Sequence, residues 1–297
     1  MFIKWSILLL GIGVLSACAV VPTGPNVMVW PAPGKPFEAF QTDEAVCRQY
    51  ARYQLGVEPA EAASQSAVNR CYFTGKLELP GSYRDLHLVR GGDAGCSVDT
   101  QKYDVFFYPA EAVATGASPV TPALANAPLE RLLVVVPHED FHSQAETRGS
   151  SPEVAEAAAT LIGFLTASEF AKDRYGEGSQ AFQRLDREAR LFLQKASIVN
   201  LYHDRVSALY SSFRSGTITR QTALARKGEL FLALERECAA IVPDPVSFNK
   251  CPAAMNNAGL AFDNTYTRRY PAMFDRYERS GEDTRATIVD LRRLLAS

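Results

Sequence analysis

A five-residue segment, His138-Glu139-Asp140-Phe141-His142, carries residue types that bind and use a metal ion. On a helix, residues four positions apart share a face, so both imidazoles of this segment can point at one ion. A carboxylate one position after the first histidine then lies beside a water bound to that ion. The pattern predicts a zinc site with His138 and His142 as ligands and Glu139 as the general base.

A catalytic zinc ion needs a third protein ligand and leaves its fourth position for water. Two glutamates, Glu153 and Glu156, follow a Ser-Pro pair at residues 151–152 that is typical of a helix start. Glu156 is flanked by alanines, so its helix can closely approach the histidine-bearing helix. Glu153 lies in the first turn, where the helix dipole favours a carboxylate. We therefore predict Glu156 as the third ligand, with Glu153 as the alternative.

The elements that must position these side chains are mainly helices. From Ser151 onward the pattern is helical almost to the end of the chain. The clearest helix covers about 182–213, where apolar side chains recur at steps of three and four. Further helices are expected over about 220–240, 256–270 and 283–295, and glycines and prolines separate them.

Strand-like pieces lie before the histidine motif, and Tyr103–Phe107 is the best of them. A loop rich in Ala and Pro follows over roughly residues 109–126. Pro137 is compatible with a first helical turn, so the motif helix is expected to begin there. The apolar LLVVV segment before it is then a strand or the end of an earlier helix. The predicted fold class is mostly α (α+β), with a small strand-containing N-terminal region.

The motif and its surroundings resemble a family of bacterial lipoproteins, the "putative aminopeptidase" family. Its zincin-type site carries H-E-x-x-H-Q, followed shortly by F-N-E-x-F-A-T-x-V-G. Here residues 138–144 read HEDFHSQ and residues 154–163 read VAEAAATLIG, which places Glu156, Thr160 and Gly163 on the family's Glu, Thr and Gly. The likeness covers about residues 104–295 and continues, in the family's order, through Leu209–Ser212, Lys227, Phe231, Asn256–Leu260, Tyr266 and Pro271–Phe274.

The resemblance implies a mainly helical zincin-like domain that hydrolyses peptide bonds at zinc, as an aminopeptidase. Two of the differences from the family pattern bear on the site: Asp140 is charged where an uncharged residue is usual, and Ala155 replaces an Asn. These two differences favour an alternative, a non-catalytic lipoprotein of degenerate zincin fold with a binding or assembly role in the envelope. The intact set of ligands and base favours the enzyme.

Hydrolysis also needs a donor for the oxyanion that forms at the scissile carbonyl. Tyr266, Tyr202 and His203 are the candidates, because they lie on helices expected to cover the site. His203 falls on an apolar stripe, which favours a hydrogen-bonded core histidine over a catalytic one. Tyr266 also has the family's position, so it is the catalytic candidate besides Glu139.

The first residues of the chain have the layout of a secretory signal. Lys4 precedes an apolar run that is too short to span a bilayer comfortably, and the run ends in Leu15-Ser16-Ala17-Cys18. This ending resembles the bacterial lipobox, which implies cleavage before Cys18 and lipidation of that residue. Ala19 in place of Asp favours the outer membrane over retention at the inner membrane. The predicted location is the periplasmic face of the bacterial outer membrane, with Cys18 as the lipid anchor.

Four regions follow from these patterns. Residues 1–17 are the predicted signal peptide, and residues 18–41 are a tether rich in Pro and Gly. Residues 42–103 are expected to hold an N-terminal helix and short strands, and residues 104–297 the zincin-like, mainly helical domain.

The periplasm is oxidising, so the five cysteines after Cys18 are candidates for disulfides. Cys238 and Cys251 flank a short segment containing prolines and could join two helices. Cys47 with Cys71 is a weaker candidate pair and leaves Cys96 alone.

The composition argues against three classes of protein: nucleic-acid binding, disordered throughout and integral to a membrane. The chain has 297 residues and a formal net charge of −2, and this balance gives no electrostatic case for binding nucleic acid, which needs a clustered excess of Lys and Arg. Hydrophobic residues make up 47% of the chain, which excludes disorder throughout. Only the N-terminal stretch is apolar enough to concern a membrane, which excludes an integral membrane protein. The expected partners are a peptide substrate and the membrane that holds the lipid anchor.

Overall fold

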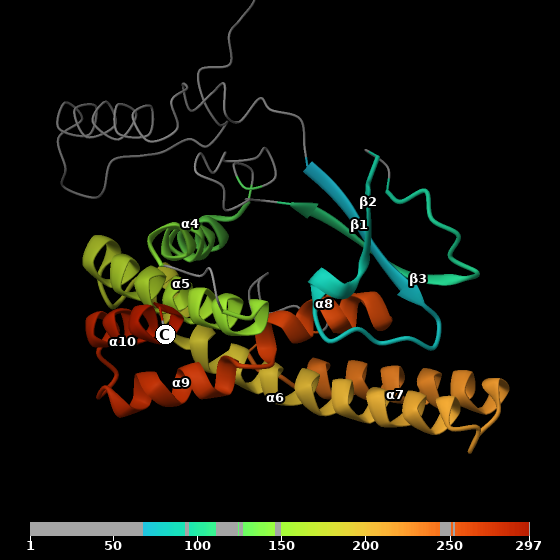
Figure 1. The fold of residues 1–297 in the computed structure, drawn as a ribbon. Helices are drawn as coiled ribbons and strands as arrows, with labels where there is room; N and C mark the ends of the chain where they lie inside the picture. Colours follow the sequence, from blue (N-terminus) through green and yellow to red (C-terminus); the bar gives the residue numbers. More distant parts are fainter. Residues whose placement is uncertain are drawn as a thin grey trace, which may run out of the picture.

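Helices make up most of the described chain, and a small antiparallel sheet lies near its start (Figure 1). The predicted class, mostly α (α+β), is therefore confirmed. The structure is a computed structural model that describes residues 68–92, 95–110, 124, 127–145, 150–243, 251 and 253–296.

The sheet contains three strands in the order β2-β1-β3. The strands are β1 (Val68–Gly75), β2 (His87–Arg90) and β3 (Tyr103–Ala110). Both pairings are antiparallel, and Arg70 of β1 pairs with Arg90 of β2 and with Tyr108 of β3. The predicted strand at 103–107 is thus present and extends to Ala110.

Two helices carry the predicted metal ligands, α4 (Leu129–Gln144) and α5 (Pro152–Tyr175). They lie side by side, and α5 also contacts α6, α8, α9 and α10 (Figure 1). The N-terminal stretch is not the only one apolar enough to concern a membrane, contrary to the expectation from the composition, because within the described residues α5 is also long and apolar enough to cross one. However, 72% of that apolar window is buried inside the protein, as in the core helix of a soluble domain.

The longest helix, α6 (Gln180–Arg214), agrees with the prediction of a helix over about 182–213. Ser179 caps its start by accepting a hydrogen bond from the Phe182 N–H. Next in the chain, α7 (Arg220–Ala239) begins after Thr219, whose side chain accepts a hydrogen bond from the Thr222 N–H. These caps explain why each helix begins within two residues of its predicted start.

Three shorter helices complete the fold: α8 (Asn257–Thr267), α9 (Tyr270–Arg279) and α10 (Thr284–Ala296). The predicted helix over 256–270 therefore ends earlier, at Thr267. The separate helix α9 was not predicted from the sequence. The largest apolar cluster lies between α4, α5, α6, α9 and α10, and its aromatic members include Phe164, Phe192, Tyr270 and Phe274.

A buried polar network holds the sheet against the helices. Asp104 of β3 pairs with Lys227 of α7 and, at 3.0 Å, with Lys76, and it accepts the Asn257 N–H at 3.0 Å. The Asn257 side chain donates to the backbone oxygens of residues 75, 76 and 78. Charge-assisted bonds of this kind are stronger than neutral ones, so they fix the sheet relative to α7 and α8.

The turn between β1 and β2 is tied to α8 by two further bonds. It contains the short 3-10 helix η1 (Tyr83–Asp85). The Thr265 hydroxyl accepts the Tyr83 N–H at 2.8 Å, and the Asn264 side chain donates to the Gly81 oxygen at 2.9 Å. The backbone that carries Tyr83 is therefore held at a defined distance from the helices.

The prediction that the motif helix begins at Pro137 is wrong. Pro137 lies inside α4, and the LLVVV segment before it belongs to the same helix. An internal proline removes one backbone hydrogen bond and costs about 3 kcal/mol. Burial of Val134, Val135 and Phe141 of α4 in the core offsets that cost.

The structure contains two disulfides in its described part. Cys238 and Cys251 are joined, with Cα atoms 5.4 Å apart, which is the pair singled out from the sequence. The weaker pairing of Cys47 with Cys71 is wrong, because Cys71 is joined to Cys96, with Cα atoms 5.7 Å apart. This bond connects β1 to the segment before β3. The residues next to Cys71 and Cys96 in the sequence carry no pattern that indicates this pairing.

The predicted limits of the four regions stay predictions. The signal peptide over 1–17, with its lipobox at Cys18, and the tether over 18–41 lie outside the described residues. So does the helix expected early in the 42–103 region.

Candidate metal centre

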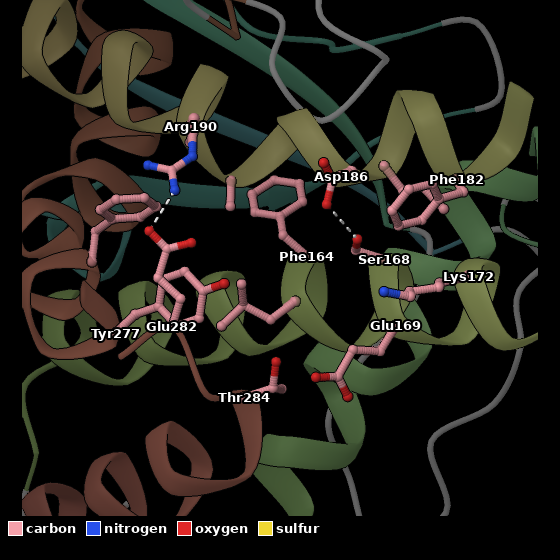
Figure 2. A pocket seen from close by; sticks show the side chains of 14 residues that line it. Phe164, Ser168, Glu169, Lys172, Phe182, Asp186, Arg190, Tyr277, Glu282 and Thr284 are labelled. Carbon is pink, nitrogen blue, oxygen red and sulfur yellow. Dashed lines mark hydrogen bonds and ion pairs between the residues drawn. The ribbon is translucent and has the colours of Figure 1, made fainter. Parts of the chain in front are cut away.

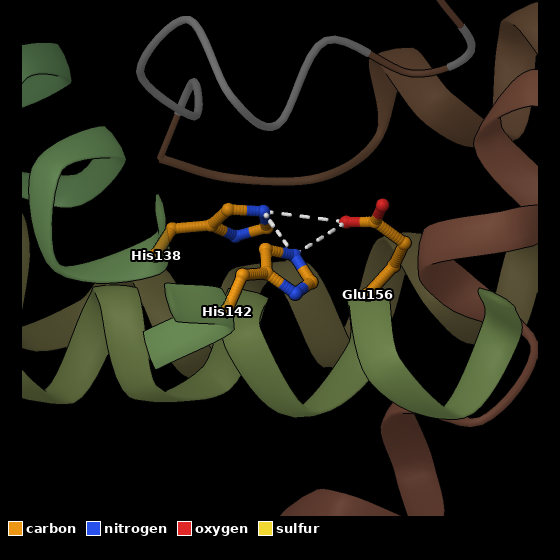
Figure 3. Close-up of side chains that lie close together, drawn as sticks. All are labelled: His138, His142 and Glu156. Carbon is orange, nitrogen blue, oxygen red and sulfur yellow. Dashed lines mark hydrogen bonds and ion pairs between the residues drawn. The ribbon is translucent and has the colours of Figure 1, made fainter. Parts of the chain in front are cut away.

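His138 and His142 lie one turn apart on α4 and point the same way (Figure 3). Their Nε2 atoms are 3.2 Å apart. The side chains are 6% and 13% exposed, respectively. The helical spacing of the motif thus brings two imidazole nitrogens to one point.

Glu156 extends from the early part of α5 toward the same point. Its Oε2 atom is 3.3 Å from the His138 Nε2 and 3.2 Å from the His142 Nε2. Glu153 does not line this site, so the choice of Glu156 over Glu153 agrees with the geometry. The three ligand atoms form a nearly equilateral triangle (Figure 3).

This triangle has the size that a tetrahedral metal ion requires. Ligand atoms about 2.0–2.1 Å from such an ion lie about 3.3–3.4 Å from one another. The observed separations of 3.2–3.3 Å are close to that value. Two imidazoles and one carboxylate are also a donor set found in catalytic zinc sites. The group His138, His142 and Glu156 can therefore hold a metal ion.

A close approach of α4 and α5 makes the triangle possible. A Cβ atom on Gly163 of α5 would lie 2.8 Å from the Val134 oxygen and 3.3 Å from the His138 Cβ, both on α4. The alanines at 157–159 are fully buried on α5. Small residues thus let the backbone of the histidine helix approach the helix that carries Glu156, as the sequence analysis expected.

Replacing Gly163 with Ala should push the two helices apart. We expect a loss of about 1–3 kcal/mol in the free energy of unfolding, because the new methyl group meets backbone that cannot rotate away. The affinity for zinc should fall as well, because the shift separates Glu156 from the histidines. Chemical denaturation and a zinc titration measure the two effects.

Gly228 of α7 provides the control, because a Cβ atom there meets nothing within 4 Å. Gly228→Ala should stabilise the protein by about 0.5–1 kcal/mol, as alanine does inside a helix. An unchanged stability and an unchanged zinc affinity in Gly163→Ala would contradict the close packing described above.

Glu139 lines the cleft beside the triangle but is not one of its corners. It is half-buried, and its charge contributes to a raised pKa of His142. Burial alone would lower the pKa of His142, but the hydrogen bond and the charge of Glu156 outweigh it. A carboxylate beside a metal site and outside its ligand set is placed to act as a base.

The cleft at the triangle has a volume of about 330 Å³. One wall is the face of the sheet and of η1, and another is formed by α4, α5 and α8. Its lining residues are Arg70, Tyr72, Tyr83, Arg84, Tyr108, His138, Glu139, His142, Ser150, Pro152, Ala155, Glu156, Phe262 and Tyr266. The three predicted ligands, the predicted base and Tyr266 thus face one cavity.

Tyr83 was not identified from the sequence, and it contacts the candidate ligand Glu156 directly. Its hydroxyl donates to the Oε1 atom of Glu156 at 2.8 Å, which leaves Oε2 toward the histidines. Burial and the neighbouring Glu156 hold the pKa of Tyr83 above its ordinary value. The bond spans 73 positions of sequence, and no local motif at Tyr83 indicates it.

The carboxyl group of Glu156 is ionised in this arrangement. Burial raises its pKa, but the hydrogen bonds and charges of His138 and His142 outweigh burial and hold the pKa well below the usual range. An ionised carboxylate with one oxygen oriented by Tyr83 is the form that a metal ligand requires.

Of the three oxyanion candidates, Tyr266 alone lines the cleft. Its ring centroid is 6.4 Å from that of His138. Burial, with Glu156 the next largest cause, raises the pKa of Tyr266 well above its ordinary value, so the hydroxyl stays protonated and can donate. Tyr202 instead bonds Glu237 at 2.6 Å, and His203 bonds the Pro80 oxygen at 3.2 Å. Both lie outside this cleft, and His203 is the core histidine that its apolar stripe indicated.

Asp140 and Ala155, two of the positions that differ from the family pattern, have different surroundings. Asp140 is exposed, does not line the cleft and accepts a hydrogen bond from Gln144 at 2.6 Å. Ala155 is buried and lines the cleft next to Glu156. The charge of Asp140 is therefore directed away from the metal centre.

A second cavity, of about 250 Å³, lies between α5, α6 and the C-terminal helices (Figure 2). Arg190 pairs with Glu282 on one side of it, and Ser168 bonds Asp186 on another. None of the predicted site residues lines it. Because it holds neither the paired histidines nor Glu156, the candidate metal centre belongs to the first cleft.

Comparison with known proteins finds one family. The sequence model of a family described as "Putative aminopeptidase" matches residues 89–297. The three predicted metal ligands, Glu139 and Tyr266 all lie within the matched residues. No curated protein and no solved structure matches the chain.

Proposed function

Because the chain belongs to the family described as "Putative aminopeptidase", we propose that it is a zinc-dependent peptidase of zincin type. The observation that carries the proposal is the triangle of His138, His142 and Glu156, whose 3.2–3.3 Å sides suit a tetrahedral ion. Zinc is the metal for which two imidazoles and one carboxylate form a typical catalytic set. When bound, zinc lowers the pKa of a coordinated water toward 7 and polarises a carbonyl.

Three residues of the chain have further roles in the proposed reaction. Glu139 takes a proton from the attacking water and delivers it to the leaving amine. Tyr266 stays protonated and donates a hydrogen bond to the oxygen of the scissile carbonyl as negative charge develops there. Tyr83 holds Glu156 in one orientation through its hydroxyl. By the family description, removal of an N-terminal residue is the reaction.

Removal of the metal tests this function. Peptide hydrolysis by the purified protein should stop after dialysis against a chelator and return when one equivalent of zinc is added. A protein that hydrolyses no peptide with zinc bound would favour the non-catalytic role in the envelope. Hydrolysis that survives complete removal of the metal would exclude the zinc mechanism.

The proposal includes an outer-membrane lipoprotein anchored at Cys18. The short apolar run before Leu15-Ser16-Ala17-Cys18 supports it, since that layout is typical of lipidated secretory signals. Several acyl chains on one residue hold a protein at a membrane stably, whereas one chain does so marginally. The catalytic domain would then work in the periplasm.

Replacing Cys18 with Ser should leave an uncleaved or mislocalised precursor, because the acceptor of the lipid is lost. Fractionation of cells measures this result, with detergent extraction of the membranes. Cys47→Ser provides the control, since Cys47 is outside the lipobox and takes part in neither observed disulfide. A Cys18→Ser protein that still fractionates with the outer membrane would remove the anchor from the proposal.

A further inference from the structure

Two arginines face the metal centre across the cleft. Arg70 and Arg84 line the same cavity as His138, Glu139 and Glu156. Within the part of the chain that the structure describes, no ion pair joins either guanidinium to a carboxylate. Arginines in a cleft without carboxylate partners are available for an anionic ligand.

Arg70 is held in place by the sheet. It lies on β1 and faces the same side as Tyr72. Its Nη1 atom donates to the Tyr72 hydroxyl at 3.3 Å, and the residue is half-buried. Tyr72 packs against Phe262 of α8, with ring centroids 5.4 Å apart. The guanidinium is therefore oriented, while most of its donors have no hydrogen-bond partner among the described residues.

Arg84 lies on the other side of this wall, in η1. It is exposed and lines the cleft beside its chain neighbour Tyr83, whose hydroxyl bonds Glu156. That hydroxyl is 2.8 Å from the Glu156 Oε1. The backbone of Tyr83, next to Arg84, is fixed to α8 through Thr265.

The charges of the cleft favour an anion. Among its described lining residues, the acidic side chains are Glu139 and Glu156, and both have roles at the metal. A divalent ion added to two arginines and two glutamates makes the cleft positive.

We infer that Arg70 and Arg84 bind a substrate carboxylate, so the substrates are peptides with a carboxylate next to the scissile bond. This inference rests on the proposed peptidase function. The carboxylate is either the free C-terminus of a short peptide or the side chain of Asp or Glu. Guanidinium groups suit both, because their paired N–H donors match the two oxygens of a carboxylate.

The arginine wall lies outside the region that identifies the family. Arg70, Tyr72, Tyr83 and Arg84 all precede residue 89, where the family match begins. The metal centre lies inside the match, so the matched region carries the residues that hydrolyse the peptide bond. The preceding segment carries the arginines that bind the substrate carboxylate. The substrate preference is therefore a property of this segment and not of the metal motif.

Matched peptides test the inference with the zinc-loaded, detergent-solubilised full chain. One pair compares Ala-Ala with its C-terminal amide, and a second compares peptide amides with Glu or Gln beside the scissile bond. We expect kcat/KM to be about 10–100-fold higher for the carboxylate member of one pair, mainly through KM, as for a charge-assisted hydrogen bond. The pair that shows the difference identifies the source of the carboxylate.

Arg70→Gln and Arg84→Gln should each lower that preference about 10-fold or more, because glutamine keeps polarity without the charge. Arg90→Gln is the matched control, since Arg90 pairs with Arg70 in the sheet, is exposed and does not line the cleft. Equal hydrolysis of both members in both pairs would overturn the inference while leaving the peptidase intact.

Calorimetric binding of glutarate to the metal-free protein separates the two proposals. We expect glutarate to bind, and to bind about 10-fold more weakly to Arg70→Gln than to Arg90→Gln. Binding of glutarate by a protein that hydrolyses no peptide would support the carboxylate site and reject the peptidase. Glutarate affinity that is equal in wild type, Arg70→Gln and Arg84→Gln would reject the carboxylate site.

Discussion

Glu139→Gln is expected to lower kcat for peptide hydrolysis by about 10²–10⁴-fold, because glutamine cannot accept the proton of the attacking water. Zinc should stay bound, because Glu139 lies beside the triangle of His138, His142 and Glu156 and is not part of it. Glutamine keeps the size of the side chain, so the stability of the fold should change little. Steady-state kinetics and the metal content of the same preparation measure both effects.

Glu153→Gln is the matched control for this experiment. Glu153 lies three positions before Glu156 on α5, but it neither lines the cleft nor belongs to the metal group. The control should hydrolyse peptides at the wild-type rate. Loss of zinc in Glu139→Gln would show that Glu139 is a ligand, and undiminished hydrolysis would show that another group is the base.

His142→Ala is expected to abolish both zinc binding and hydrolysis, since it removes one of three protein ligands. The lost side chain is 13% exposed and bonds Glu156 at 3.2 Å, so part of the packing between α4 and α5 is lost with it. The remaining His138 and Glu156 leave too few protein ligands for a stable zinc site. A zinc titration with a competing chelator and circular dichroism separate lost affinity from lost folding.

His87 supplies the matched control, because it is an exposed histidine on β2 outside the cleft. His87→Ala should keep both the metal and the activity. If His142→Ala, correctly folded, bound zinc as tightly as the wild type, the proposed ligand set would be wrong.

The local part of the site could be predicted from the sequence. The spacing of His138 and His142 fixes a shared helix face, and the small residues around Glu156 indicate a close helix contact. The structure brings these three side chains together within hydrogen-bonding distance. Helix limits were predictable where caps and turns are local, as at Ser179 and Thr219.

The remainder depends on contacts between distant segments. Tyr83 bonds Glu156 across 73 positions, and Arg70 enters the cleft because the sheet packs on α8. Neither position carries a pattern of its own. Pro137 was misjudged for the same reason, since burial of the helix on both sides of it offsets a local preference. The separate helix α9 was missed because its start follows the end of α8 within three residues.

The metal content of the purified wild-type protein tests the central claim most directly. Elemental analysis of protein prepared without chelators, or reloaded with zinc and then desalted, gives the number of zinc ions per chain. The geometry of His138, His142 and Glu156 predicts one zinc ion per chain, bound tightly enough to survive desalting. A folded protein that retains no zinc after reloading would contradict the metal centre and the peptidase mechanism built on it.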